Sequence, residues 1–377
     1  MIRPVARDEL PDTSLAARLR ARIASDGPIS IEAFMEACLS DARHGTYASR
    51  QPIGSAGDFI TAPEISQIFG ELLGLWSVAV WQSMGEPSTV TVAELGPGRG
   101  TLMKDALRAW RGVPEFLNSV SVALIETSPV MTKAQGNALK NAPVPLGWHA
   151  TLEAAPEGPL IILANEFVDA LPIRQFVGRG GDWHERLIKN DGRGSFAFVE
   201  APRSQPEPPG SGPAAAEGAI RETRPALQEL LRELARRAGR APLAALIIDY
   251  GHAESGFGDT LQAVRAHRFT DPLADPGAAD LTAHVDFADL RQHATALGLA
   301  AYGPMPQGQF LLKLGLGERR ARLLDSATPA QAEAITSGES RLVDPRQMGA
   351  LFKVLVLTSA ALAPPPPFGP DHFALSS

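Results

Sequence analysis

The stretch that determines the predicted fold is Val90-Thr91-Val92-Ala93-Glu94-Leu95-Gly96-Pro97-Gly98-Arg99-Gly100-Thr101. Its first six residues are largely apolar and rich in β-branched side chains, which is typical of an inner strand. Three glycines then alternate through a turn, where their freedom at positive φ lets a ligand approach the backbone. Residues 102–110 follow with apolar side chains at helical spacing. This order predicts the ligand crevice of a doubly wound α/β sheet.

Further elements extend this pattern along the chain. We expect strands at 120–125, 144–148, 160–164 and 243–248, and helices at 129–140, 224–238, 282–297, 318–325, 328–337 and 345–356. Residues 173–178, 184–189 and 195–200 alternate like an antiparallel meander and are expected to form a β insertion after the strand at 160–164. Two late strands, 299–304 and 309–314, have the spacing of an antiparallel hairpin at a sheet edge.

The N-terminal residues are expected to form a helical lid. Helices are predicted at 14–26 and 31–40, and Thr61 and Glu64 have capping-box spacing that starts a helix reaching about residue 84. Asp58 lies in a glycine-rich segment just before that helix. The segment is either a lid over a ligand or an ordinary loop and cap. The whole chain is accordingly divided into 1–85, 86–172, 173–220, 221–316 and 317–377.

The spacing of the glycines favours one ligand over another. A dinucleotide fold requires Gly-x-Gly-x-x-Gly, whereas here Glu94 precedes Gly96, Gly98 and Gly100 at two-residue intervals. This shorter loop suits a ligand without phosphates, such as S-adenosyl-L-methionine. Glu126 ends the next strand, where an acid accepts hydrogen bonds from ribose hydroxyls in binders of either ligand. The late hairpin favours a class I methyltransferase, with a dinucleotide as the alternative.

Composition excludes several classes of protein. The formal net charge of −7 argues against non-specific nucleic-acid binding. Cys38 is the only cysteine, so no disulfide framework or cysteine-based metal site is expected, and its helical surroundings predict a core residue. No apolar run reaches the roughly 18 residues that a membrane span needs. The N-terminus has no apolar signal region and carries acidic residues, so a cytoplasmic protein is expected.

Six motifs resemble the MidA family of class I methyltransferases. They lie at residues 57–64, 94–101, 164–172, 248–251, 280–287 and 348–355. The matches run from about residue 10 to 360, and the block Asn-Glu-Phe-x-Asp-Ala-Leu-Pro at 165–172 is highly specific. Residues 201–219 depart from the pattern and are interpreted as an expanded variable loop.

The resemblance implies a Rossmann-like fold and S-adenosyl-L-methionine-dependent protein arginine methylation. The family includes a mitochondrial complex I assembly factor, and its eukaryotic members dimethylate an arginine symmetrically on a complex I subunit. The implied partner is therefore a complex I subunit or a similar protein, and a homodimer is possible. Two alternatives stay open: an assembly factor that binds cofactor without turnover, and a small-molecule methyltransferase.

Site roles follow from these positions. Glu94, Gly96, Gly98, Gly100 and Glu126 are expected to bind the cofactor, with Asp58 and Thr61 in the lid. Carboxylates that hold a guanidinium by paired hydrogen bonds aim its nitrogen at the methyl group, so the predicted catalytic residues are Asn165, Glu166 and Asp169.

Other polar residues have weaker interpretations. Asp169 is equally well explained as a first-turn helix acid. Asp249 is expected to face the same crevice. Asp280 and His284 are expected on one helix face, as a substrate-facing base or a surface pair, and no metal site is predicted.

Overall fold

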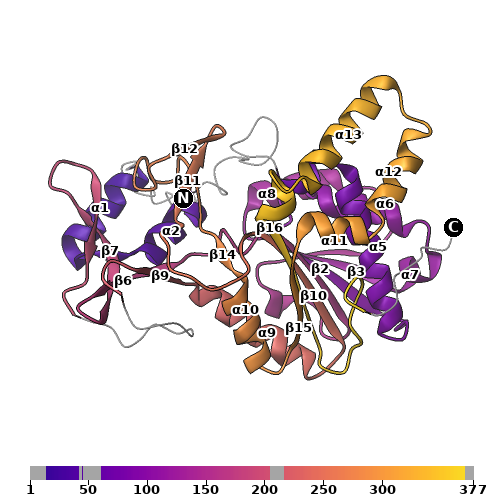
Figure 1. The fold of residues 1–377 in the computed structure, drawn as a ribbon, viewed down its shortest axis with the longest axis horizontal. Helices are drawn as coiled ribbons and strands as arrows, with labels where there is room; N and C mark the ends of the chain where they lie inside the picture. Colours follow the sequence, from indigo (N-terminus) through magenta and orange to yellow (C-terminus); the bar gives the residue numbers. More distant parts are fainter. Residues whose placement is uncertain (1–13, 42–44, 46–60, 204–215, 370–377) are drawn as a thin grey trace, which may run out of the picture.

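The computed structural model describes residues 14–41, 45, 61–203 and 216–369. Its central sheet contains β2 (Val90–Leu95), β3 (Val120–Ile125), β4 (Leu146–His149), β5 (Leu160–Asn165), β10 (Leu243–His252), β14 (Val285–Asp286), β15 (Ala300–Pro306) and β16 (Phe352–Thr358). The strand order is β15-β16-β10-β5-β2-β3-β4, with β14 beside the end of β10 (Figure 1). Strands β10, β5, β2, β3 and β4 run parallel, and β16 is antiparallel to both of its neighbours.

Helices cover both faces of this sheet, as its parallel strands require. One face packs against α5 (Gln67–Ser83), α6 (Thr101–Trp110) and α7 (Pro114–Ser119). The opposite face packs against α9 (Pro225–Ala238) and α10 (Phe287–Ala296). Within β2, Val92 faces the first core and Ala93 the second, so the strand is buried on both sides. The predicted class of fold is confirmed, with α8 (Pro129–Ala138) linking β3 to β4.

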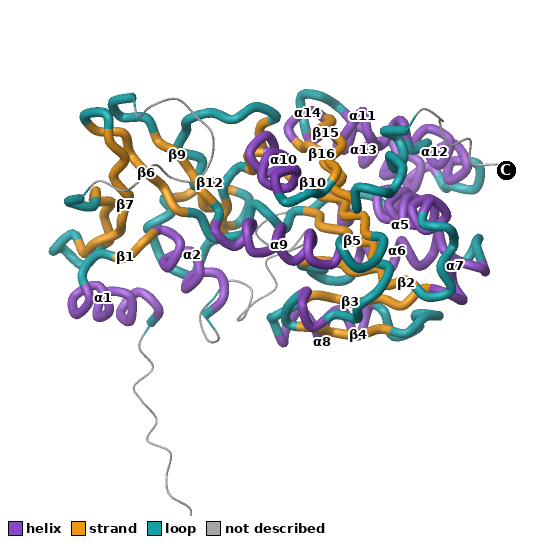
Figure 2. The backbone as a smooth tube through the Cα atoms, turned by 90° about the horizontal axis from the view of Figure 1, so that it is seen from below, coloured by secondary structure: helices purple, strands orange, loops and turns teal. Residues whose placement is uncertain are grey.

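A second lobe lies beside the central sheet (Figure 2). Its larger sheet contains β1 (Ile29–Ser30), β6 (Arg174–Arg179), β7 (Asp182–Asn190), β8 (Phe196–Glu200) and β9 (Ile220–Thr223). A smaller sheet holds β11 (Gln262–Arg265), β12 (Arg268–Thr270) and β13 (Asp280–Thr282). Helices α1 (Leu15–Asp26) and α2 (Ile31–Ser40) share a hydrophobic core with these sheets, and this core includes the buried Cys38. The predicted meander is therefore the centre of a lobe of its own.

The N-terminal helices separate into two groups rather than forming one lid. Helices α1 and α2 belong to the second lobe, whereas α5 belongs to the core of the central sheet. The helix predicted to run from Thr61 is interrupted at Ser66, which has an extended backbone and separates the short α4 (Ala62–Ile65) from α5.

The predicted late hairpin is wrong in its second strand. Residues 309–314 belong mostly to α11 (Gln307–Lys313), in which Gln307, Phe310 and Leu311 are buried at helical spacing. The antiparallel partner of β15 is β16, which overlaps the end of the segment 345–356 that the sequence predicts to be helical. The β16 run is apolar and buried on both faces, and periodicity alone cannot distinguish such a run from a buried helix.

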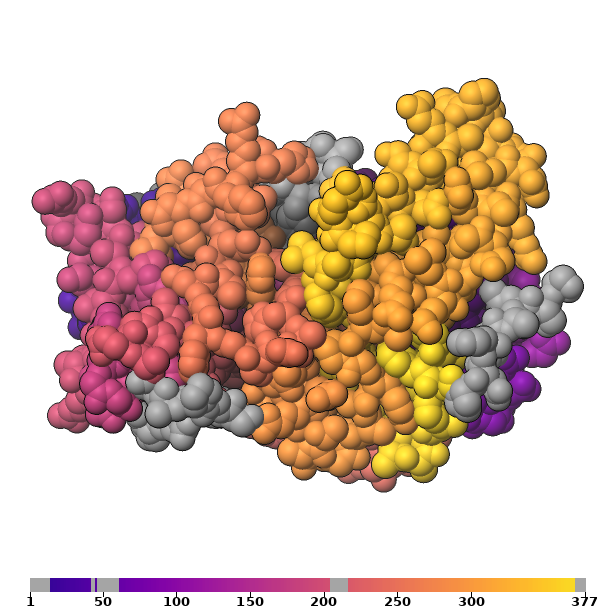
Figure 3. Space-filling model, in the orientation of Figure 1, coloured from indigo at the N-terminus to yellow at the C-terminus, as the bar shows by residue number. Residues whose placement is uncertain are grey.

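The C-terminal helices are α12 (Leu316–Leu324), α13 (Pro329–Val343) and α14 (Met348–Leu351). In Figure 3, α12 and α13 form the yellow-orange projection at the upper right of the molecule. In the part of the chain that the structure describes, none of the helices combines the length and apolarity that a membrane crossing demands.

Candidate active site

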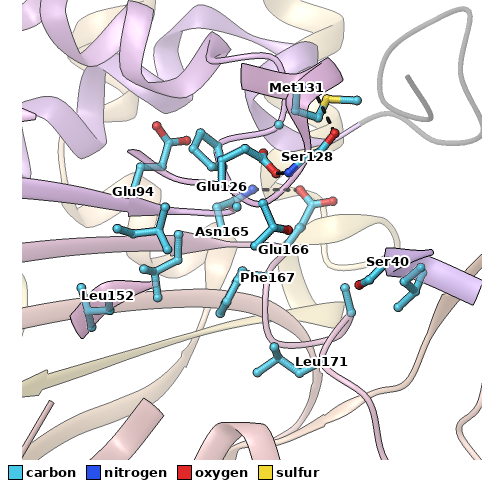
Figure 4. A pocket seen from close by; sticks show the side chains of 18 of the residues that line it. Ser40, Glu94, Glu126, Ser128, Met131, Leu152, Asn165, Glu166, Phe167 and Leu171 are labelled. Atoms are coloured by element: carbon cyan, nitrogen blue, oxygen red, sulfur yellow. Dashed lines mark hydrogen bonds between the residues drawn. The ribbon is translucent and has the colours of Figure 1, made fainter. Parts of the chain in front are cut away.

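A cavity of about 670 Å³ opens at the carboxyl ends of β2, β3 and β5. The described residues that line it include the glycine turn, the ends of these strands and parts of α2, α4 and α9 (Figure 4). Seven of the described lining residues are glutamates: Glu36, Glu64, Glu94, Glu126, Glu153, Glu166 and Glu229. The single cationic side chain in that described lining is Arg99, which lies 3.6 Å from Glu64. The cavity is therefore strongly acidic.

The glycine turn has the left-handed backbone that was expected from its sequence. The φ angles are +61° at Gly96, +51° at Gly98 and +81° at Gly100. A Cβ at Gly96 would lie 2.9 Å from Cδ2 of Phe167, so glycine is needed there for space as well as conformation. Gly96 and Gly98 line the cavity, whereas Gly100 is not among its lining residues and instead lies against Gln135.

Glu94 presents an unpaired acceptor at the start of this turn. Its side chain is 4% exposed, and its Oε2 has no hydrogen-bond partner among the described residues. Burial raises the pKa of Glu94 to about 8, because the charged form loses its hydration. A ligand with a positive charge or a hydrogen-bond donor would satisfy this oxygen.

Glu126 lines the cavity at the end of β3 with both oxygens held. Its Oε1 accepts a hydrogen bond of 2.7 Å from the backbone amide of Ser128, and its Oε2 accepts one of 2.9 Å from Nε2 of Gln135. Burial raises the pKa of Glu126, and these hydrogen bonds oppose the shift. A carboxylate has about four acceptor positions, so Glu126 keeps capacity for a donor of a ligand.

Asn165 and Glu166 lie together where β5 ends. Oε1 of Glu166 accepts hydrogen bonds from the amide of Ala62 at 2.9 Å and from Nδ2 of Asn165 at 3.1 Å. Oδ1 of Asn165 is buried and has no partner among the described residues. Glu166 has a φ of +50°, a conformation that costs a non-glycine residue about 1–3 kcal/mol and is concentrated at functional sites. Burial, assisted by the nearby Asp169 carboxylate, raises the pKa of Glu166 to about 7.

Asp169 and Asp249 lie behind this turn, and neither is among the described residues that line the cavity. The expectation that Asp249 faces the crevice is wrong: it is fully buried, and its Oδ2 accepts hydrogen bonds from the amides of Val168 and Asp169 at 2.9 and 3.1 Å. Asp249 thus fixes the turn that carries Glu166. Asp169 belongs to that turn rather than to a helix, and burial raises its pKa to about 6.

Helix α4 connects the two sides of the cavity. Thr61 lines the cavity, but it makes no side-chain cap bond, so the predicted capping box is wrong. Glu64 instead accepts a hydrogen bond from the hydroxyl of Thr101 at the start of α6, while Glu166 holds the amide of Ala62. Asp58 lies outside the residues that the structure describes.

The predicted pairing of Asp280 and His284 on a helix is wrong. Asp280 lies in β13, and His284 follows that strand in the loop before β14. The helix α10 begins only at Phe287, capped by the side chain of Asp286. Sequence reasoning also missed Gln135, whose role is visible only through its contacts, and the cavity residues Ser128, Met131 and Leu152, which follow strand ends.

Comparison with known proteins agrees with this geometry. Residues 72–305 match the Methyltransf_28 family of S-adenosyl-L-methionine-dependent methyltransferases. A Drosophila melanogaster relative named protein arginine methyltransferase NDUFAF7 homolog, mitochondrial, is 39% identical, and the match covers 93% of this chain and 86% of the relative. The Homo sapiens protein arginine methyltransferase NDUFAF7, mitochondrial, is 35% identical, with coverage of 93% and 84%.

A solved structure gives the same fold. A crystal structure from Burkholderia thailandensis, bound to S-adenosyl-homocysteine, has a TM-score of 0.77 and 27% identity to this chain. The match covers 91% of each chain. The MidA-type methyltransferase fold and the cofactor predicted from the sequence are confirmed. The prediction of a cytoplasmic protein is contradicted, because the relatives are named as mitochondrial proteins.

Proposed function

The chain belongs to the S-adenosyl-L-methionine-dependent methyltransferase family that its residues 72–305 match, and from this membership we propose that it methylates an arginine side chain of a protein. The choice of arginine as the acceptor comes from the relatives, which are named protein arginine methyltransferases. The observation that carries the proposal in this chain is a pair of buried hydrogen-bond acceptors without a partner among the described residues, Oε2 of Glu94 and Oδ1 of Asn165, beside the carboxylate of Glu166.

The residues around the glycine turn fit the cofactor. Oε2 of Glu94 offers an acceptor for the amino group of its methionine part, and the absence of a Cβ at Gly96 lets the turn lie against Phe167 in the cavity wall. Glu126 accepts hydrogen bonds from the protein on both oxygens, and a carboxylate has further acceptor capacity for the ribose hydroxyls. When bound, S-adenosyl-L-methionine supplies a methyl group made electrophilic by the attached sulfonium.

The residues at the end of β5 suit a guanidinium. A guanidinium has donors and no acceptors, which complements Oδ1 of Asn165 and the outward oxygen of Glu166. Because the side chain of Glu166 is held by Asn165 and by the amide of Ala62, it needs little reorientation when a substrate binds. With a pKa of about 7, Glu166 is also suited to accept the proton that the guanidinium loses.

We extend the proposal to the partner and the product on the basis of the family resemblance. The proposed acceptor is an arginine of a respiratory complex I subunit, and the proposed product is symmetric dimethylarginine. A homodimer is proposed as well, and light scattering of the purified chain would test it.

The function is tested by transfer of an isotope-labelled methyl group from S-adenosyl-L-methionine. The acceptors are purified complex I subunits and synthetic peptides with one arginine, with matched lysine peptides as controls. We expect label on arginine alone, with the site and the symmetric product identified by mass spectrometry. Binding of S-adenosyl-homocysteine without any turnover would support an assembly factor that does not catalyse transfer. Label on small molecules alone would support a small-molecule methyltransferase.

A further inference from the structure

Gln135 is a fully buried residue of α8 that lies behind the cavity wall. All of its hydrogen-bonding groups contact other parts of the site: Nε2 donates to the carbonyl of Gly98 at 2.8 Å and to Oε2 of Glu126 at 2.9 Å, and Oε1 accepts from Nε1 of Trp148 at 2.9 Å. One side chain therefore joins the glycine turn, the end of β3 and strand β4.

The chemistry of these partners fixes the orientation of the amide. A backbone carbonyl and an ionised carboxylate can only accept, and an indole N–H can only donate. Rotating the amide of Gln135 by half a turn would place its oxygen against Gly98 and Glu126 and its NH₂ group against Trp148. All three hydrogen bonds would then be lost, so a single arrangement is stable.

The backbone around Gln135 is also packed closely against the turn. An added Cβ on Gly100 would lie 3.5 Å from Cα and 3.6 Å from Cγ of Gln135. These are ordinary van der Waals distances, so α8 lies next to the turn at Gly100, although Gly100 does not line the cavity itself. The distance between Gly98 and Glu126 is consequently set by one helix and one amide.

We propose that Gln135 is a positioning residue that sets the affinity for the cofactor without contacting it. By holding the carbonyl of Gly98 and the carboxylate of Glu126, it fixes the separation between the turn and the ribose-binding acid. The inference rests on the proposed placement of the cofactor between these two groups. Sequence patterns do not reveal this role, because a glutamine on a helix is usually exposed.

The test is the dissociation constant for S-adenosyl-homocysteine, measured by calorimetry on the full chain. Gln135→Glu keeps the size but replaces two donors by an acceptor facing Glu126, and Gln135→Met removes the polar groups at similar volume. We expect the constant to rise at least tenfold in Gln135→Glu and severalfold in Gln135→Met. Trp148→Phe removes one donor and is expected to raise the dissociation constant about twofold.

A second glutamine provides the matched control. Gln307 is equally buried and donates to the carbonyl of Leu342 at 3.0 Å, but it is not among the described residues that line the cavity or contact its turn. Gln307→Ala should lower the melting temperature and leave the dissociation constant unchanged. If Gln135 had only a structural role, its variants would behave like Gln307→Ala. Their melting temperature would be lower, but adding S-adenosyl-homocysteine would raise it by as much as in the wild type.

The possible outcomes separate the two proposals. If the wild-type chain binds S-adenosyl-homocysteine and both Gln135 variants bind it equally well, the role of Gln135 is refuted and the proposed function is untouched. If both variants bind S-adenosyl-homocysteine more weakly, and their KM for S-adenosyl-L-methionine rises while kcat is retained, the positioning role is supported. If the wild-type chain does not bind the ligand, the placement of the cofactor itself is wrong.

Discussion

Around Glu126, each carboxylate oxygen has a protein donor and every polar group of Gln135 is paired, whereas around Glu166 the buried Oδ1 of Asn165 has no described partner. We name these regions the ribose end (Glu126, Ser128, Gln135) and the transfer end (Glu94, Asn165, Glu166). The side chains of the ribose end are held by hydrogen bonds within the protein. The transfer end has acceptors without a partner among the described residues and a strained φ at Glu166. The difference indicates that binding geometry is fixed in advance at one end, while the other is completed by its ligands.

The largest expected effect comes from removing the charge at the transfer end. Glu166→Gln keeps an oxygen for the amide of Ala62 but cannot attract a guanidinium or accept its proton, so kcat should fall about 10²–10³-fold. Initial rates of labelled methyl transfer would measure the loss. The dissociation constant for S-adenosyl-homocysteine should stay within about twofold of wild type. A variant with full activity would show that the acceptor is not held by Glu166.

The raised pKa values at the transfer end predict an unusual dependence of stability on pH. Glu94 has a folded pKa of about 8, above the unfolded value of 4.5. Its contribution to stability is therefore fully present below about pH 4.5 and is lost as the pH rises through 8. The free energy of unfolding without ligand should fall between pH 6 and 8.5, by at most about 1.4 kcal/mol per pH unit for one group.

Glu94→Gln checks the source of this pH dependence in urea titrations. The variant should lose less stability than wild type over the same interval, while Glu166, Asp169 and Asp249, whose pKa values are also raised, keep part of the slope. Glu157→Gln is the control, because an arginine lowers the pKa of this exposed residue and it stays ionised throughout. Equal slopes in wild type and Glu94→Gln would contradict the assignment.

At the glycine turn, the expected effect is smaller. Gly96→Ala combines a left-handed φ with a Cβ 2.9 Å from Phe167, so it should destabilise the fold by about 1–3 kcal/mol and weaken binding of S-adenosyl-homocysteine. Gly27→Ala separates the two causes, since Gly27 has a φ of +88° but nothing within 4 Å of the added Cβ. It should cost stability through conformation alone and leave binding unchanged. If both variants bind equally well, the close approach at Gly96 has no role in binding.

The sequence located single residues at both ends but not the contacts that hold them, for physical reasons. Strand β2, the turn and Glu126 follow from local rules: apolar runs, glycine spacing and an acid at a strand end. At the transfer end, the sequence located Asn165 and Glu166, but their arrangement depends on residues far away in the chain. The amide of Ala62 and the buried Asp249 fix the turn from two other elements, and no local pattern shows that.

The same reasoning explains the error at the edge of the sheet. Strand β16 reaches β15 only after the excursion through α11, α12, α13 and α14. The apolar runs of α11 and β16 are both compatible with helix or strand, and only their pairing and burial distinguish them. A hairpin between neighbouring segments was the shorter connection and therefore the prediction. Burial on both faces of β16 requires α10 on one side and α11 on the other, which is tertiary information.

The smallest expected effect concerns the link between the two ends. Helix α4 joins them, since the amide of Ala62 bonds to Glu166 and the side chain of Glu64 bonds to Thr101. Thr101→Val keeps the shape of the side chain but removes the hydroxyl donor, so that among the described residues Glu64 retains its ion pair with Arg99 at 3.6 Å. Because the bond is partly exposed, we expect a loss of about 1 kcal/mol, equivalent to about fivefold weaker cofactor binding.

Thr101→Val therefore tests whether the ribose end and the transfer end are coupled. If α4 transmits position between them, the variant should raise KM for S-adenosyl-L-methionine and also lower kcat, although Thr101 lies at the start of α6 and Glu166 at the end of β5. If the two ends are independent, only KM should change. Combining Thr101→Val with Glu166→Gln distinguishes these cases further, because coupled sites give non-additive free energies and independent sites add.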